Sequence, residues 1–305
     1  YPISADSELP FEQHRDIFHL TGIDQEETIL LLYPPSKDDK TREILFIRKS
    51  DNHTKVWEGE KLSKKQANEL SGINSIYFID DFKDILSSIA TKVDTFYINK
   101  NEHYRANSPV ETREDRFISW LLKKYPAHNV AKSNPILQRQ RSIKHPDEID
   151  QIKKACDITR KGFNRVLEFI KPNVWEYEIE AEFIHEFINS SSKGFAYSPI
   201  IASGNDNNVL HYIKNNKQCK SGELILMDVG AEYGNYSSDM TRTVPVSGKF
   251  SKRQKEIYNA VLRVKNEATK LLTVGNNWKI FHEQVGEIMT KELLDIGLID
   301  KNDIK

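Results

Sequence analysis

The sequence predicts a mixed α/β protein of two domains, and three observations support this fold class. The chain has 305 residues, which suits two domains of ordinary size better than one. Its first half alternates short apolar runs with helix-like segments, as an α/β unit does. Its second half has long segments of helical periodicity around two strand-like runs. We therefore expect an α/β domain over residues 1–143 and an α+β domain over residues 144–305.

The first half should form a small mixed sheet with helices. Two apolar runs, 28–33 and 43–47, flank a segment whose two prolines and several charges indicate a turn or loop, so these runs are predicted as a β-hairpin. Two further apolar runs, 75–80 and 95–99, bracket a helix-like segment. This alternation of strands and helices is typical of an α/β unit.

The boundary between the domains is expected near Lys144. The segment 113–125 is predicted as the last helix of the first domain, because Pro126 follows it. A polar and basic stretch comes next and contains Pro135 and Pro146. Proline and acidic residues are favoured in the first turn of a helix, so a new helix is predicted to begin at Pro146.

Four helices are expected in the second domain. The first repeats apolar residues at helical spacing from Pro146 until Pro172 ends it. The second spans about 176–190 and should bury four residues: Ile179, Phe183, Phe187 and Ile188. Strands follow, and then two more amphipathic helices, whose apolar residues include Val261 and Ile280.

Composition excludes several classes of protein. Lys and Arg number 44 against 45 Asp and Glu, a net charge of −1, so no basic field favours nucleic acid. No apolar run approaches the roughly 18 residues of a membrane span, so we expect no membrane partner. The two cysteines, Cys156 and Cys219, suggest neither a zinc site nor a disulfide framework, and the start shows no signal peptide. We therefore expect a cytoplasmic protein, although the sequence does not begin with Met.

Two aspartates are predicted to share one face of a hairpin in the segment 223–246. Its strand-like halves flank Gly234 and Asn235, a plausible two-residue turn because both residue types tolerate positive φ. With that turn, Asp228 lies opposite Thr241. Because side chains alternate between faces, Asp228, Asp239 and Thr241 then point to the same side. The β-carbons of the two aspartates would be diagonal neighbours, about 7 Å apart.

Two carboxylates on an apolar strand pair repel each other and lose hydration, so a compensating charge is expected. A divalent cation would supply it, and the metals of two-metal hydrolases lie about 3.5–4 Å apart. The alternative is structural: Asp228 ends a strand, and Asp239 lies in a turn. A three-residue loop would also place the two carboxylates on opposite faces.

His211 is a further candidate, because it directly follows the flexible stretch SGNDNN. The alternative is a histidine with a structural role at a strand edge. Two other histidines, His185 and His282, each precede a glutamate, but Asn189 and Gly286 occupy the place of the second histidine in HExxH, so no zincin site is supported. The motifs GxSxG, GxxxxGK[ST] and GxGxxG are absent, which argues against a serine hydrolase or a nucleotide-binding enzyme.

Several segments together resemble the creatinase and aminopeptidase family of the pita-bread fold, and most of all its aminopeptidase P branch. They are LPFEQHRDIFHLTGI from Leu9, VWEGEKL around Trp57, RSIKHPDEIDQIKKA from Arg141 and DVGAEYGNYSSDMTRTVPVSGKF from Asp228. They occur in the order of the family and cover nearly the whole chain. The resemblance implies a creatinase-like N-terminal domain followed by a pita-bread catalytic domain.

The resemblance also implies roles for five residues. Asp228 matches an aspartate that ligates one metal ion, and Asp239 matches one that bridges two ions. His211 matches a histidine that contacts the substrate near the scissile bond, and Thr241 matches a threonine that supports the metal cluster. Trp57 matches a tryptophan that helps to wall the active site of a neighbouring subunit; the alternative is a half-buried aromatic side chain beside a turn.

The function implied by the resemblance is metal-dependent removal of an N-terminal residue that precedes proline, by a hydroxide bridging two divalent ions. Mn²⁺ suits the carboxylate ligands, with Zn²⁺ or Co²⁺ as alternatives. The partners implied are proline-containing peptides and further copies of the chain, in a homodimer or homotetramer. Two alternatives stay open: a Xaa-Pro dipeptidase, and an inactive pita-bread module that binds peptides or proteins.

The end of the sequence departs from the family pattern. Relatives supply one more histidine and two glutamates as metal ligands, in motifs that follow a helix resembling residues 277–301. None of these motifs occurs before Lys305. We therefore expect the pita-bread domain to be incomplete at its C-terminus, and we expect the general base, a glutamate, to lie outside this sequence.

Overall fold

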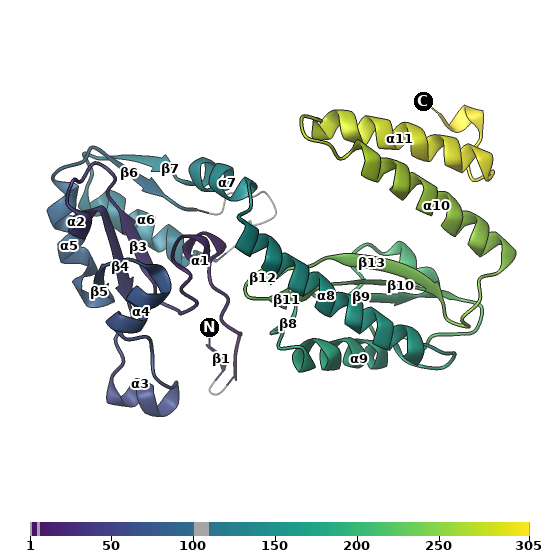
Figure 1. The fold of residues 1–305 in the computed structure, drawn as a ribbon, viewed down its shortest axis with the longest axis horizontal. Coiled ribbons are helices and arrows are strands. Elements are labelled where there is room, and N and C mark those ends of the chain that lie inside the picture. The colour runs from purple at the N-terminus through teal and green to yellow at the C-terminus, as the bar shows by residue number, and fades with distance from the viewer. Residues whose placement is uncertain (1, 5–6, 101–109, 305) are drawn as a thin grey trace. The chain divides into compact units, whose positions relative to one another are not determined.

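The computed structural model describes residues 2–4, 7–100 and 110–304. Its internal contacts divide the chain into two compact units, Tyr1–Pro146 and Asp147–Lys305 (Figure 1). Each unit has its own sheets and its own buried apolar clusters.

The first unit contains a three-stranded mixed sheet. Strand β4 (Glu43–Ile47) lies between β3 (Ile29–Leu32), which is antiparallel to it, and β5 (Ser75–Phe78), which is parallel. The predicted hairpin and the mixed sheet are therefore confirmed. A short helix, α2 (Asp39–Arg42), lies within the hairpin connection, where only a loop was expected.

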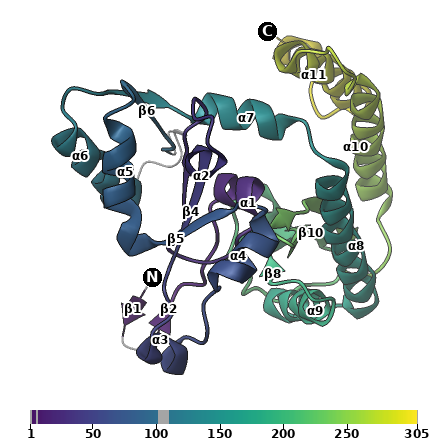
Figure 2. The ribbon, with the colours of Figure 1, turned by 60° about the vertical axis from the view of Figure 1, so that its left-hand side comes forward.

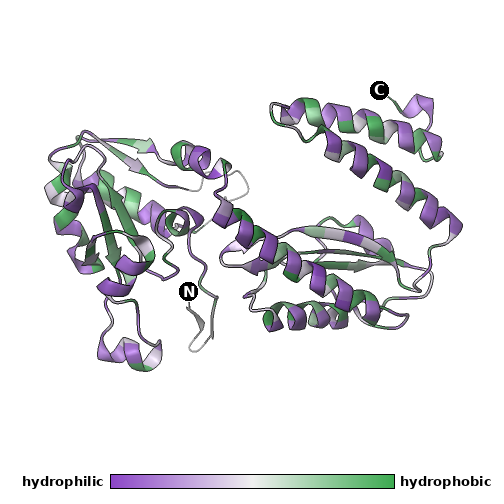
Figure 3. Cartoon of the chain, in the orientation of Figure 1, coloured by the Kyte–Doolittle hydropathy of each residue, from purple (hydrophilic) through white to green (hydrophobic). Residues whose placement is uncertain are grey.

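Strand β4 is apolar on both faces because both faces of this sheet are covered. Leu45 and Ile47 pack into one buried cluster, while Ile44 and Phe46 pack into another with residues of helix α5 (Phe82–Ala90). Hydrophobic residues gather on these central strands (Figure 3). A continuous apolar run, rather than strict alternation, is typical of a strand buried on both sides.

Helix α6 (Arg113–Lys124) forms as predicted, but it is not the last helix of the first unit. The polar stretch after it forms β7 (Asn129–Lys132), parallel to β6 (Thr95–Ile98), and then α7 (Asn134–Ser142). Pro135 lies in the first turn of α7, where its missing N–H is not needed. The other elements described in this unit are β1 (Pro2–Ser4), β2 (Ser7–Glu8), α1 (Arg15–Thr21), α3 (Asn52–Trp57), α4 (Lys64–Ser71) and the short 3-10 helix η1 (Ile79–Asp81).

The second unit packs two long helices against a sheet. Helices α8 (Pro146–Phe169) and α9 (Glu176–Asn189) lie beside the strands (Figure 2). Phe163, Phe183 and Phe187 from these helices share one buried cluster with three residues of the sheet: Ile225, Met227 and Val229. Both helices were predicted, but Ile188 is 56% exposed rather than part of the core, because it faces away from this cluster.

Strand β10 (Leu224–Val229) is central to the second unit. It pairs antiparallel with β13 (Met240–Pro245) on one side and with β9 (Ile200–Ser203) on the other. Its alternate residues Ile225, Met227 and Val229 are buried, whereas Leu226 and Asp228 on the opposite face are half-buried. A second sheet is made of β8 (Gly194–Phe195), β11 (Ala231–Tyr233) and β12 (Tyr236–Ser237).

Two further helices follow the sheet, α10 (Lys252–Leu271) and α11 (Trp278–Asp295). Arg263 of α10 donates two hydrogen bonds, of 2.8 and 2.6 Å, to the carboxylate of Glu292 on α11. Both helices were predicted, but their apolar residues are mostly not buried: Val261 is 52% exposed and Ile280 is 50% exposed. Among the described residues, no helix has the length and apolar character that a bilayer crossing requires.

Candidate metal centre

The two aspartates are placed by a tight hairpin turn at Gly234 and Asn235. Their φ angles are 57° and 65°, the left-handed pair that a type I′ turn requires. Tyr233 pairs with Tyr236 across this turn. The same register continues into β10 and β13, where Asp228 lies opposite Thr241, so the predicted register is confirmed.

The carboxylates of Asp228 and Asp239 converge on one phenol. The hydroxyl of Tyr197 donates a 2.7 Å hydrogen bond to Asp228 Oδ1 and lies 3.3 Å from Asp239 Oδ1. Asp228 is half-buried and Asp239 is exposed. The pair therefore lies on the face of β10 that the core helices leave open.

Tyr197 acts as a neutral donor between two negative charges. Burial, followed by the hydrogen bond to Asp228, raises the pKa of Tyr197 well above its ordinary value of 10. The phenol therefore keeps its proton, and its hydroxyl acts as a hydrogen-bond donor to the carboxylates. Sequence reasoning missed Tyr197, because it lies before β9 and no short turn fixes the register of β9 against β10.

The donor set fits a divalent metal ion in part. Carboxylate oxygens are hard ligands of the kind that Mn²⁺ and Mg²⁺ accept. A shared hydroxyl satisfies only one oxygen of each carboxylate, which leaves further lone pairs for a cation. Within residues 2–4, 7–100 and 110–304, no group of three or more His, Cys, Asp or Glu side chains could by itself hold a metal ion. Asp228 and Asp239 would thus supply two donors of a larger set.

Thr241 and His211 are both exposed, but only Thr241 lies in a strand that pairs with Asp228. Thr241 is exposed and directly opposite Asp228 on β13. His211 is exposed in the connection between η3 (Gly204–Asn208) and β10. In the described part of the chain, no hydrogen bond or ion pair joins His211 to either aspartate. The expectation that His211 lies near the pair stays a prediction.

Trp57 lies in the first unit, at the end of α3. Its side chain is 75% exposed, and its ring centroid lies 6.1 Å from that of His53. The alternative of a half-buried aromatic side chain is therefore wrong, because α3 does not turn this ring toward the core. Val56 beside it is 80% exposed.

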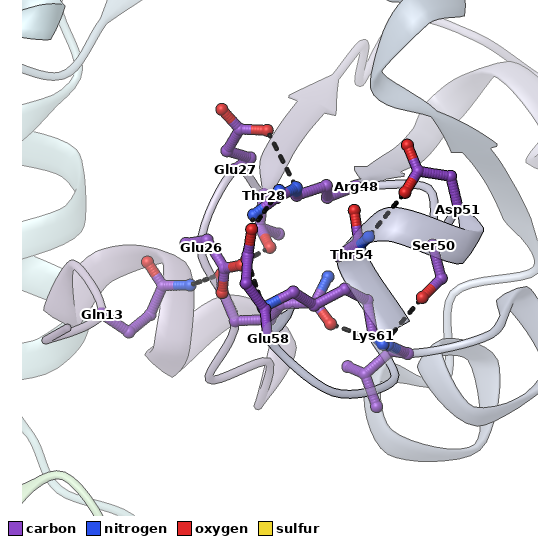
Figure 4. Close-up of polar contacts among 12 residues, drawn as sticks. Gln13, Glu26, Glu27, Thr28, Arg48, Ser50, Asp51, Thr54, Glu58 and Lys61 are labelled. Carbon is purple, nitrogen blue, oxygen red and sulfur yellow. Dashed lines mark hydrogen bonds and ion pairs between the residues drawn. The ribbon is translucent and has the colours of Figure 1, made fainter. Parts of the chain in front are cut away.

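An ion-pair network holds the segment that follows Trp57. Arg48 donates to both oxygens of Glu58, at 2.7 and 2.9 Å, and also bonds to Glu26 at 3.0 Å (Figure 4). Lys61 lies 2.6 Å from Glu26 and 3.1 Å from Glu58. The hydrogen bonds from Arg48 and then from Lys61 lower the pKa of Glu58. These contacts fix the end of α3 and hence the base of the Trp57 side chain.

Both units match known family models. Residues 150–302 match the model of metallopeptidase family M24, and residues 1–97 match the N-terminal domain of aminopeptidase P. The expected order, an N-terminal domain of this type followed by part of a pita-bread domain, is confirmed by these matches and by the similarity to solved structures.

Individual relatives point to the same family as the two family models. The chain is 32% identical over 302 residues to a Xaa-Pro aminopeptidase of Haemophilus influenzae, covering 98% of this chain and 66% of that protein. A solved Bacillus anthracis structure assigned as an aminopeptidase P has a TM-score of 0.91 and 32% identity, over 99% of this chain and 71% of that one. A zinc-substituted Escherichia coli aminopeptidase P with bound product has a TM-score of 0.86 and 29% identity, over 98% and 68%.

The chain thus spans about two thirds of the length of the relatives that it matches. The M24 model alone matches half of the chain, and it covers β10, which carries Asp228, as well as the segment between β12 and β13, which carries Asp239. On these grounds the chain belongs to metallopeptidase family M24.

Proposed function

We propose that this chain carries the N-terminal domain and part of the catalytic domain of a Xaa-Pro aminopeptidase, which removes an N-terminal residue that precedes proline. The observation that carries this proposal is the convergence of Asp228 and Asp239 on Tyr197, on the open face of the central sheet. The names of the relatives support the same reaction.

Asp228 and Asp239 would hold the divalent ions, with Asp239 between two of them. Ions held there would polarise the scissile carbonyl and activate a water molecule for attack. We propose Mn²⁺ because the two proposed donors are carboxylates. Zn²⁺ is an alternative because a solved relative is zinc-substituted, and Co²⁺ is a second alternative.

The residues of this chain would prepare the site for that chemistry. Tyr197 keeps the two carboxylates turned toward each other by donating its hydroxyl hydrogen. Thr241 would support Asp228 from the opposite strand. His211 would donate a hydrogen bond to the substrate near the scissile bond, where negative charge develops during attack.

Proline explains why such a peptidase needs its own site. The proline ring fixes φ, and its nitrogen carries no N–H in a peptide. Peptidases that grip an extended backbone through that donor bind such substrates poorly. In this proposal, recognition comes instead from contacts to the free N-terminus and to the scissile region.

The proposal is tested by product analysis with the whole protein expressed from its complete coding sequence and loaded with Mn²⁺. Release of free alanine from Ala-Pro-Ala supports the aminopeptidase. Cleavage of Ala-Pro alone would instead identify a dipeptidase. Fewer than one bound ion per chain, with no hydrolysis of either peptide, would identify an inactive binding module.

We also propose a homodimer or homotetramer in which the exposed Trp57 reaches the site of a neighbouring subunit. Light scattering measures the oligomeric state, and Trp57→Ala should weaken activity without changing the metal content. A monomer with full activity would contradict this part of the proposal. Cytoplasmic location stays a prediction that fractionation would test.

A further inference from the structure

A buried carboxylate that the proposed chemistry does not use lies beneath the connection that carries His211. Glu176, the first residue of α9, is 0% exposed. Its Oε1 accepts hydrogen bonds from Ser203 N at 2.7 Å and Ser203 Oγ at 2.8 Å. Its Oε2 accepts from Tyr212 Oη at 2.8 Å and Lys217 N at 3.0 Å. Four donors thus satisfy one fully buried carboxylate.

These four donors come from three places along one segment. Ser203 ends β9, and Tyr212 and Lys217 both lie in the connection between η3 and β10. A buried charge is tolerated only when it is well hydrogen-bonded, and the N-terminus of a helix also favours a carboxylate. Glu176 therefore ties the end of β9 and two residues of the connection to one point of α9.

A second buried polar residue fixes the same connection. Asn215 is 3% exposed, and its Oδ1 accepts a 3.0 Å hydrogen bond from Ile201 N on β9. Its Nδ2 donates to Glu180 Oε2 at 2.9 Å and to Pro199 O at 3.0 Å. The connection between Tyr212 and Lys217 is therefore anchored to both β9 and α9.

The residues around His211 are left exposed by this arrangement. Leu210 is 87% exposed and Ile213 is 60% exposed, whereas Tyr212 between His211 and Ile213 is half-buried. Tyr212 is thus the inward anchor nearest to His211. Burial and the bond to Glu176 raise the pKa of Tyr212 to about 12, so its hydroxyl stays a donor at neutral pH.

We propose that Glu176 and Tyr212 are positioning residues that hold His211 in place for the substrate. The inference rests on the proposed role of His211 and adds two residues that act through it. Without the hydroxyl of Tyr212, the exposed part of the connection has one anchor fewer, and the imidazole occupies its working position for a smaller fraction of the time.

The test uses Tyr212→Phe in the whole protein, which removes one hydroxyl and keeps the ring. The matched control is Tyr125→Phe, which removes a hydroxyl that lies 2.8 Å from Ser87 Oγ in the first unit. Hydrogen exchange of residues 209–214 should become at least about tenfold faster in Tyr212→Phe, because a hydrogen bond to a charged group is lost. The control should leave that exchange unchanged. Glu176→Gln, which keeps the shape of the side chain but loses acceptor capacity, should act in the same direction.

Activity supplies a second readout. Tyr212→Phe should keep the metal content of the parent and lower kcat on Ala-Pro-Ala by about 10- to 100-fold, the usual cost of a misplaced reacting geometry. In a His211→Ala background, the same change should alter kcat by less than about twofold, because a residue that acts only through His211 has nothing left to position.

The outcomes separate this inference from the proposed function. Unchanged exchange and turnover in Tyr212→Phe, with a rate loss in His211→Ala, would overturn the inference alone. If Tyr212→Phe lowered kcat equally in the parent and in the His211→Ala background, the role of Tyr212 would be merely structural. That result would also overturn the inference. Normal turnover in His211→Ala would overturn both the role of His211 and the inference that depends on it.

Discussion

Gly230 lies so close to the backbone carbonyl of Ser238 that a β-carbon at Gly230 would be 1.9 Å from that oxygen. The contact joins the end of β10 to the residue before Asp239. Ser238 is itself fixed, because its Oγ lies 2.7 Å from Thr159 Oγ1 of α8 and both oxygens accept from Ala231 N. The position of Asp239 thus depends on a site where only glycine fits.

Gly230→Ala should therefore lower the free energy of unfolding by about 3 kcal/mol, because the new methyl group displaces a backbone segment in a packed region. Urea denaturation measures the loss. Gly286→Ala is the matched control, since a β-carbon there meets nothing within 4 Å and α11 should gain about 0.5–1 kcal/mol. Equal stability of the two variants would show that the strands near Ser238 can separate at little cost.

Tyr197→Phe should weaken metal binding and lower kcat/KM by about 10- to 100-fold, the usual effect of losing a group that orients metal ligands. The remaining ring should preserve the fold. Calorimetric titration with Mn²⁺ measures the affinity, and Tyr258→Phe on α10 serves as a control of equal chemistry. Unchanged affinity in Tyr197→Phe would mean that the aspartates need no help from this hydroxyl.

His211→Ala should retain two metal ions and lose about 10²- to 10³-fold in kcat, as expected when one stabilising contact to the reacting centre is removed. Metal analysis and steady-state kinetics on the same preparation check both parts. Loss of the metals would make His211 a ligand instead, and normal turnover would remove it from the mechanism.

The ion pairs around Arg48 should make the first unit more stable at neutral than at acid pH. Because the folded pKa of Glu58 lies below its ordinary value of 4.5, its stabilising effect is fully present above pH 4.5 and is lost as the pH falls through the folded value. Glu58 is 41% exposed, so screening by solvent limits this effect to about 1 kcal/mol.

Glu58→Gln should lower the free energy of unfolding at about pH 7, and the difference from the parent should shrink by about pH 4 or below. Urea denaturation across this range measures it. Glu69→Gln is the control, because the ion pair of Glu69 with Lys65 is a long contact of 3.8 Å and both side chains are exposed. Its loss should therefore change stability little. A difference that persists at low pH would show that the effect does not come from the charge of Glu58.

The sequence predicted most of the local structure because its signals are local. A two-residue turn at Gly234 and Asn235 fixes the register that places Asp228 opposite Thr241, so counting residues sufficed. Tyr197 could not be found in this way, since its place beside Asp228 depends on the pairing of β9 with β10 across a long connection.

Helix α7 and the buried Glu176 were missed for different reasons. The polar composition around Pro135 resembles a linker, yet proline in the first turn permits a helix. A glutamate in the first turn of a helix is usually exposed to solvent. Glu176 is buried because Ser203, Tyr212 and Lys217, which come later in the chain, donate hydrogen bonds to its carboxylate. Tertiary contacts, rather than local propensity, decide such positions.

The central claim, that Asp228 and Asp239 hold the ions that carry out Xaa-Pro hydrolysis, is tested most directly by Asp239→Asn in the whole protein. Bound Mn²⁺ and the rate of alanine release from Ala-Pro-Ala are measured together, with the far-ultraviolet circular dichroism spectrum as the check on folding. We predict an unchanged spectrum, loss of the paired ions and a rate lower by at least about 10³-fold, because the bridging negative charge is removed. Unchanged metal content and turnover in Asp239→Asn would contradict the account.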